Sequence, residues 1–170
     1  MISVEYCQLL ARYNRWMNER LYAVAAQLSE PERKQDRGAF FGSIHRTLNH
    51  ILWADRTWLG RFTGVPHTVA AFGADMYDDF ATLQAERDAT DTRLLDWAGN
   101  LRPDWLAASI EYRAASDGKR RQMAGWIAAA HLFQHATHHR GQLSTLLKQA
   151  GRDVGATDLP YLPGVVRILD

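Results

Sequence analysis

Four of the seven histidines in this chain lie within nine residues, at positions 131, 135, 138 and 139. On a helix, residues four apart share a face and are separated by about 6 Å along the axis. Two imidazoles at that spacing can bind one metal ion through bonds of about 2.0–2.1 Å. His131 and His139 are about 12 Å apart, too far to share one ion easily. The spacing therefore predicts a site that uses His135 with either His131 or His139.

A third ligand has to come from another segment, and His50 is the best candidate. Metal sites in helical bundles are built from side chains that project inward from facing helices. His45 is five residues earlier and about 140° around the same predicted helix, so it cannot face the site with His50. Three imidazoles would leave coordination positions open, as expected of a catalytic site.

The remaining histidines have simpler interpretations. His138 points about 100° away from His139 and leaves the row. We expect His138 and His67 to be exposed or structural. For His131, a structural role is preferred over those of an alternative ligand or a residue that orients a ligand.

Four helical segments are expected to position these side chains, because their apolar residues recur every three or four positions. They span about 3–28, 44–62, 76–98 and 124–150. Pro31 ends the first segment and Ser43 caps the second. Residues 32–42 are interpreted as a polar connection. Segments of roughly 20–27 residues would be about 30–40 Å long, and such similar lengths favour a four-helix bundle.

Three local features complete the predicted all-α architecture. The third segment has a polar middle, including Arg87 and Asp91, which we interpret as a wide solvated face. Residues 103–123 contain Asp117-Gly118, a strong turn signal, and predict a small hairpin or extended excursion that lies on the bundle. Gly151 is expected to stop the last helix, before an irregular tail.

Composition limits the classes of function. The formal charge of +1 gives no reason to expect a nucleic-acid partner. No stretch approaches the roughly 20 apolar residues needed to span a bilayer, and no signal peptide is recognisable. Cys7 cannot form an intramolecular disulfide, and we expect it to be a small buried hydrophobe. These features predict one domain over residues 1–170, in the cytoplasm, with no membrane partner.

Three motifs in order resemble the DinB-like family, named for damage-inducible proteins. Residues 13–21 are similar to its YNxWxNxxL pattern, residues 48–55 to its histidine-and-aspartate segment, and residues 135–143 to HxxxHHRGQ. The resemblance implies an antiparallel-type four-helix bundle, often dimeric, with a three-histidine metal site. The ligand positions of the family fall on His50, His135 and His139, which decides against His131.

The resemblance also suggests a reaction class. Relatives include transferases that use thiols such as bacillithiol, and mycothiol-dependent isomerases. We therefore expect a metal-dependent enzyme, a thiol transferase or a hydrolase, that acts on a small-molecule thiol or electrophile as a homodimer. Ni²⁺ or Zn²⁺ is the expected ion, and Fe²⁺ and Mn²⁺ are compatible. The alternative is a non-catalytic metal-binding module for stress response or ligand binding. A DNA-binding role is disfavoured by the near-neutral charge.

The residues beside the last motif raise further expectations. Arg140 could bind an anionic substrate or a carboxylate on another helix. Gly141 costs about 1 kcal/mol relative to alanine in a helix, which close helix packing would explain better than room for a substrate. Asp55 is not on the face of His50 but could orient a neighbour. Metal affinity should fall as pH drops through about 6.5, the unperturbed imidazole pKa.

Overall fold

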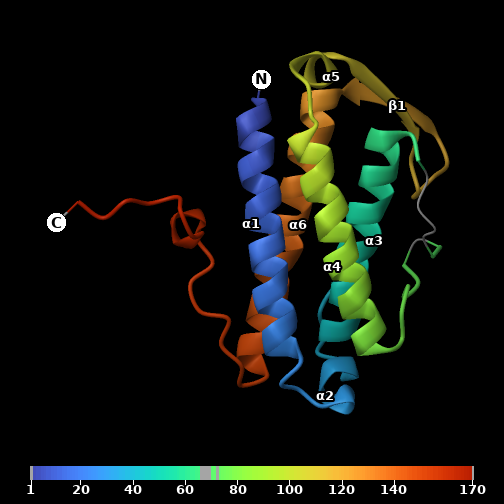
Figure 1. Cartoon of the computed structure of the whole chain (residues 1–170). Coiled ribbons are helices and arrows are strands. Elements are labelled where there is room, and N and C mark those ends of the chain that lie inside the picture. The colour runs from blue at the N-terminus through green and yellow to red at the C-terminus, as the bar shows by residue number, and fades with distance from the viewer. Residues whose placement is uncertain (1, 66–69, 72, 170) are drawn as a thin grey trace.

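The computed structural model describes residues 2–65, 70–71 and 73–169. Four long helices lie side by side (Figure 1), which confirms the predicted bundle: α1 (Val4–Ala25), α3 (Ile44–Thr63), α4 (Phe80–Gly99) and α6 (Gly125–Gln149). The smaller elements are α2 (Glu30–Lys34), α5 (Pro103–Ala107), β1 (Ser109–Arg113), β2 (Arg120–Ala124) and the 3-10 helix η1 (Leu159–Tyr161).

Each long helix packs against two others, so that α1 contacts α4 and α6, and α3 contacts the same two helices. The pairs α1–α4 and α3–α6 are antiparallel, whereas α3 and α4 run in the same direction (Figure 1). The long connection between Thr63 and Phe80 returns the chain to the starting end of α3. The antiparallel arrangement implied by the family resemblance thus holds for the pair that carries the predicted ligands, α3 and α6.

The helix that carries His50 begins and ends where the sequence predicts. The Ser43 hydroxyl accepts a hydrogen bond of 3.1 Å from the Arg46 backbone N–H, which satisfies one free donor of the first turn. Gly64 follows the helix with φ of +70°, a conformation that favours glycine. Gly151 has φ of +76° after α6, as expected of a helix stop.

The predicted hairpin is also confirmed. β1 and β2 pair antiparallel, from Ser109 opposite Ala124 to Arg113 opposite Arg120. The Ala114 N–H donates a 3.0 Å bond to the Lys119 carbonyl and closes the connecting turn. The ring of Tyr112 packs against that of Trp58 at a centroid distance of 5.1 Å and so holds β1 against α3. The hairpin therefore covers one side of the α3–α6 pair.

Some predicted helix boundaries were wrong. The first helix ends at Ala25, and residues Glu30–Lys34, partly within the predicted connection, form α2. Pro31 lies in the first turn of α2, where its missing N–H costs nothing, and Ser29 and Glu32 form a capping box. Proline here starts a helix as well as preventing the continuation of the previous one.

The third long helix begins at Phe80 and not at Met76, because other groups bind the backbone before it. The Asn49 side-chain oxygen accepts bonds of 2.9 Å from both the Met76 and the Tyr77 N–H. The Asp79 carboxylate then accepts from the Thr82 N–H at 2.7 Å and caps α4. Residues 76–79 are therefore tied to α3 and do not form a turn of α4.

A polar layer divides the core of the bundle into two apolar clusters. One cluster includes Met17, Leu48, Leu83 and Leu143. The other includes the following side chains: Ala11, Leu59, Leu94 and Leu132. On every long helix the polar layer lies between them, as in α3, where Asp55 separates Leu52 from Trp58. The layer is thus a continuous level of the bundle.

Arg87 and Asp91 lie in this layer, so the prediction that the middle of the third segment is a solvated face was wrong for both. Each is 1–2% exposed, as is Asp55. Arg87 Nη1 donates to Asp55 at 2.8 Å, and its Nε and Nη2 donate to the two oxygens of Asp91 at 3.1 and 2.8 Å. A polar sequence pattern cannot distinguish solvation from pairing within the bundle.

The other helices complete the layer. Asn14 and Asn18 of α1 donate to Asp91 at 3.0–3.2 Å. Arg140 of α6 donates to the Asn14 oxygen and, at 3.0 Å, to the Thr137 hydroxyl. The first motif of the sequence therefore contributes two asparagines to a structural hydrogen-bond network that joins all four long helices.

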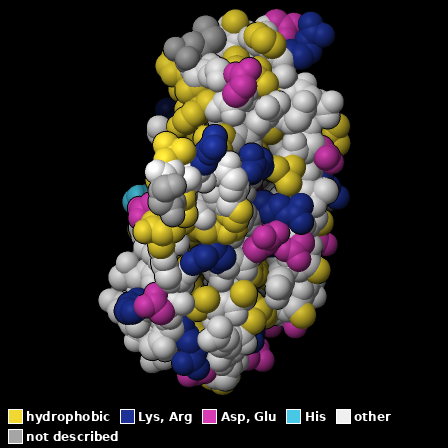
Figure 2. Space-filling view, turned by 60° about the vertical axis from the view of Figure 1, so that its left-hand side comes forward, with side chains coloured by type: hydrophobic (Ala, Val, Ile, Leu, Met, Phe, Trp, Pro, Cys, Tyr) yellow, Lys and Arg dark blue, Asp and Glu magenta, His cyan; other side chains and the backbone are white. Residues whose placement is uncertain are grey.

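The outer surface carries both signs of charge. On the face in Figure 2, Lys and Arg side chains are interspersed with acidic and hydrophobic ones. Within the described residues, none of the helices has the length and apolar character required to cross a membrane.

Candidate metal centre

Three histidines from α3 and α6 meet between these two helices. A ring nitrogen from each of His50, His135 and His139 lies within 4.8 Å of those of the other two. The Nε2 atom of His135 is 3.3 Å from that of His50 and 3.2 Å from that of His139. His50 and His135 are partly buried and His139 is buried. The structure thus brings together the three residues that the family resemblance selects.

A neighbouring amide orients one of these rings. His139 Nδ1 lies 2.8 Å from the side-chain oxygen of Gln142, one helical turn further along α6. An amide oxygen can only accept, so Nδ1 carries the proton and donates. The neutral imidazole then presents its Nε2 lone pair to the other two histidines. Such bonds from the outer nitrogen are the usual way in which a metal-ligating histidine is oriented.

The cluster disfavours protonation. Burial, reinforced by the neighbouring imidazoles, lowers the pKa of His135 to about 3 and that of His50 to about 4. Burial also lowers the pKa of His139, although its bond to Gln142 acts in the opposite direction. All three side chains are therefore neutral at pH 7, the state required of an imidazole ligand.

The donor geometry fits a small divalent ion. With bonds of about 2.0–2.1 Å and tetrahedral angles, two nitrogen ligands lie about 3.3 Å apart. Two of the three nitrogen separations in the structure, 3.3 and 3.2 Å, agree with that value. In the tautomers that direct their Nε2 lone pairs at one another, these nitrogens would repel at this distance, and a cation between them would remove the repulsion. Three imidazoles suit zinc, nickel, copper or iron, and leave at least one position open.

Phe41 forms one wall of the cluster. Its ring stacks on His50 at a centroid distance of 3.9 Å and meets the edge of His139 at 5.4 Å. Sequence reasoning missed this residue, because it lies in the segment interpreted as a polar connection. The available signal was a pair of adjacent aromatic residues, Phe40 and Phe41, just before the Ser43 cap. Phe41 shields one side of the cluster from solvent.

A pocket of about 310 Å³ opens beside the cluster, between α3, α6 and the hairpin. His50 and His135 line one part of it, and His131 lies one turn away, with ring centroids of His131 and His135 5.6 Å apart. The aromatic residues Trp58 and Tyr112 contribute further lining. A small molecule in this pocket could reach two of the three predicted ligands.

Three other histidines within the described residues are not members of the three-histidine cluster, although the His138 ring lies 4.8 Å from that of His139. His45 is buried and its Nε2 is 2.9 Å from the Tyr77 carbonyl, so the prediction that it cannot face the site is confirmed. His138 is exposed and contacts Gln142, and His131 is exposed at the pocket. The prediction for His67 concerns a position outside the described residues.

Residues near the last motif have structural roles or open surroundings. Arg140 is 3% exposed and binds the side-chain amide of Asn14 on another helix, whereas the sequence analysis considered an anionic substrate or a carboxylate. The packing explanation for Gly141 was wrong, because a Cβ added there would meet nothing within 4 Å. Asp55 orients Arg87. Cys7 is buried as predicted, and burial raises the pKa of its thiol to about 11.

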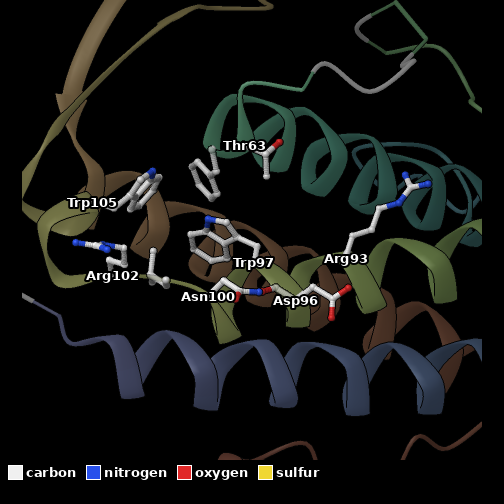
Figure 3. Close-up of a pocket in the computed structure, with 9 residues that line it drawn as sticks. Thr63, Arg93, Asp96, Trp97, Asn100, Arg102 and Trp105 are labelled. Atoms are coloured by element: carbon white, nitrogen blue, oxygen red, sulfur yellow. The ribbon is translucent and has the colours of Figure 1, made fainter.

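A second pocket, of about 410 Å³, lies near the ends of α3 and α4 and beside α5. Figure 3 shows Trp97 and Trp105 at one end of this pocket and Arg93 at the other. Among the described residues that line it there is no histidine or cysteine. This pocket therefore does not contribute to the metal centre.

Comparison with known proteins identifies the family. The chain is 22% identical to Protein DinB of Bacillus subtilis (strain 168) over 162 residues, 88% of each protein. It also resembles a crystal structure of a DinB-like protein from Bacillus cereus ATCC 10987, with a TM-score of 0.62 and 19% identity, over 83% of this chain and 90% of that one. At that identity the structural likeness shows the fold alone. Residues 1–164 match the model of the DinB family, and the chain therefore belongs to this family.

Proposed function

We propose that this protein binds a divalent metal ion through His50, His135 and His139 and is a metal-dependent enzyme. The observation that carries the proposal is the convergence of three imidazole nitrogens on one point beside an open pocket. A purely structural site is normally closed by four protein ligands. Three ligands next to a cavity of about 310 Å³ favour a catalytic arrangement.

The protein residues have separate tasks in this proposal. When bound, the ion would act as a Lewis acid and lower the pKa of a thiol or a water molecule. His50, His135 and His139 hold the ion, and Gln142 fixes the orientation of His139. Phe41 excludes water from one side, so that a substrate approaches from the pocket.

A thiol transferase is the preferred reaction class within this proposal. Deprotonation of a thiol needs only a lowered pKa, whereas a hydrolase usually needs a base beside the attacking water. Cys7 is too deeply buried to serve as the nucleophile, so the thiol would come from a second substrate. We extend the proposal to nickel or zinc as the native ion, and to a homodimeric, cytoplasmic protein with one domain.

Elemental analysis of the purified protein tests the metal site directly. We expect about one divalent ion per chain in the wild type, and its loss in His50→Ala and His135→Ala. His131→Ala is the matched control, because His131 lies on the same helix one turn from His135 but outside the cluster. Equal metal content in His50→Ala and the wild type would refute the ligand assignment.

Turnover of electrophiles with a panel of small thiols tests the enzymatic part. We expect thiol consumption by the metal-loaded wild type and none by His50→Ala that has been treated with the same metal salt, at equal protein concentration. Metal binding that stabilises the protein without any turnover would favour the non-catalytic module instead. Sedimentation of the wild type measures the proposed dimer in the same preparation.

A further inference from the structure

The helix that carries His50 also positions an arginine in the same pocket. Arg61 is eleven residues after His50, a rotation of about 1100°, which is three full turns and only about 20° more. Both side chains therefore lie on one face of α3, together with Ala54 and Thr57, and all of them line the pocket of about 310 Å³. The pocket thus extends from the histidine cluster along α3 towards Arg61.

The Arg61 guanidinium is held in place by two aromatic rings. Its central carbon lies 4.3 Å from the ring centroid of Trp58 and 4.6 Å from that of Tyr112. Arg61 Nη2 donates a 3.0 Å hydrogen bond to the Arg113 carbonyl of the hairpin. A guanidinium has five N–H donors, and this is its one hydrogen bond to any residue that the structure describes. Several directed donors therefore remain for a ligand.

The charge of the pocket lining is one-sided. Arg61 and Arg121 line it, and none of the described lining residues is acidic. Arg121 is paired with Asp117 at 2.9 Å in the hairpin, which offsets its charge. Arg61 has no such partner among the described residues, and burial lowers its pKa. An anion beside Arg61 would supply the missing countercharge.

We propose that the pocket binds a small organic carboxylate, with its anionic group at Arg61 and its reactive end beside the three histidines. A planar carboxylate matches the guanidinium fork and can accept two parallel N–H bonds. One unpaired positive charge suits a monoanion better than a dianionic phosphate. Trp58 and Tyr112 provide apolar contact for the carbon skeleton between the two ends. This inference rests on the proposed metal-dependent function and specifies the substrate class of that site.

Matched probes separate the two ends of the pocket. The protein is loaded with Co²⁺ and titrated with mercaptopropanoate, mercaptohexanoate and mercaptooctanoate, each carrying its thiol and its carboxylate at opposite ends. The corresponding mercapto alcohols are neutral controls of equal length. Near-ultraviolet thiolate-to-cobalt absorption reports the metal end, and calorimetry reports affinity. We expect the acid of best length to bind about tenfold more tightly than its alcohol, since charge-assisted hydrogen bonds are roughly twice as strong as neutral ones.

Substitution of the arginine decides the inference. Arg61→Gln should bind acid and alcohol equally, Arg61→Lys should retain part of the preference, and Arg121→Gln should retain it fully. Because each ratio is measured within one variant, partial destabilisation does not obscure it. Equal affinity of the wild type for acids and alcohols at every length would overturn the inference. Absence of thiolate absorption with every probe would instead refute the proposed thiol chemistry, while the calorimetric ratio still decides the role of Arg61.

Discussion

Two polar clusters lie within the bundle, and they are built in opposite ways. In the polar layer, Arg87 donates hydrogen bonds to the carboxylates of Asp55 and Asp91. Two asparagines donate further hydrogen bonds to Asp91. In the histidine cluster, three nitrogens face one another at 3.2–3.3 Å. The polar layer pairs the charges of Arg87, Asp55 and Asp91 with one another, whereas the histidine cluster brings three ring nitrogens together at a point that could hold a cation.

This difference indicates which motif residues serve the fold and which serve the chemistry. A buried polar network is acceptable when its members are paired, because an unpaired charge is costly in the low-dielectric interior. Asn14, Asp55 and Arg140 belong to motifs that resemble the family, yet they bind within the bundle. The histidines belong to two of the same motifs but leave a site for a ligand. Pairing within the bundle, and not membership of a motif, separates the two roles.

The largest effect is expected when the polar layer is broken. Arg87→Met should destabilise the protein by about 3–5 kcal/mol, because it leaves the Asp55 and Asp91 carboxylates buried without a counter-ion. Arg15→Met is the matched control: Arg15 also pairs with an acid four residues later, but at the surface, where such pairs contribute about 0–1 kcal/mol. Urea unfolding measures both. Similar losses in the two variants would contradict the distinction between buried and exposed pairs.

A pH titration tests the histidine cluster. In the folded, metal-free protein the pKa of His50 is lowered to about 4 and that of His135 to about 3, whereas unfolded imidazoles titrate near 6.5. Between about pH 6.5 and 4 the unfolded state therefore binds more protons, so the free energy of unfolding should fall as the pH falls through this window. Denaturant unfolding of the metal-free wild type from pH 7.5 to 5 measures this.

His135→Gln is the control for that titration, since removal of one titrating imidazole should flatten the slope. A wild-type stability that is independent of pH between 7 and 5 would argue against neutral buried imidazoles. The same lowered pKa values also shift the loss of metal affinity to a pH below about 6.5. An unperturbed imidazole would already begin to be protonated and to release the ion near about pH 6.5. Protons compete less well for nitrogens that are already difficult to protonate.

The histidine cluster was largely predictable from the sequence, whereas the polar layer was not. The histidine cluster follows from helical geometry: four-residue spacing limits the choice on α6, and the family motif selects His139 over His131. The bundle and hairpin follow from periodicity and the Asp117-Gly118 turn. The polar layer could not be predicted, because Arg87 and Asp91 have the spacing of an exposed ion pair. Only packing against α1 and α3 reveals that they are buried.

Removal of the orienting amide should have a smaller effect on the metal than removal of a ligand. Gln142→Met keeps the length of the side chain but removes the acceptor for His139 Nδ1. We expect metal affinity to decrease about 10–100-fold, as is usual for residues that orient metal ligands. Gln134→Met, an exposed position on the same helix, is the control. Competition with a chelator measures both, and an unchanged affinity in Gln142→Met would show that His139 is oriented by packing alone.

The smallest effect is expected at Gly141. In the sequence it stands between Arg140, a member of the polar layer, and Gln142, which orients His139. Gly141→Ala should stabilise the protein by up to about 1 kcal/mol, because alanine is the better helix former and the added Cβ meets nothing within 4 Å. Gly125→Ala is the opposite case on the same helix, since its Cβ would clash with the Trp105 carbonyl. Thermal unfolding ranks the two variants. If Gly141→Ala gains stability but loses affinity for the metal or a thiol probe, the open space at this glycine is reserved for the site, because packing gives no other reason to omit a methyl group there.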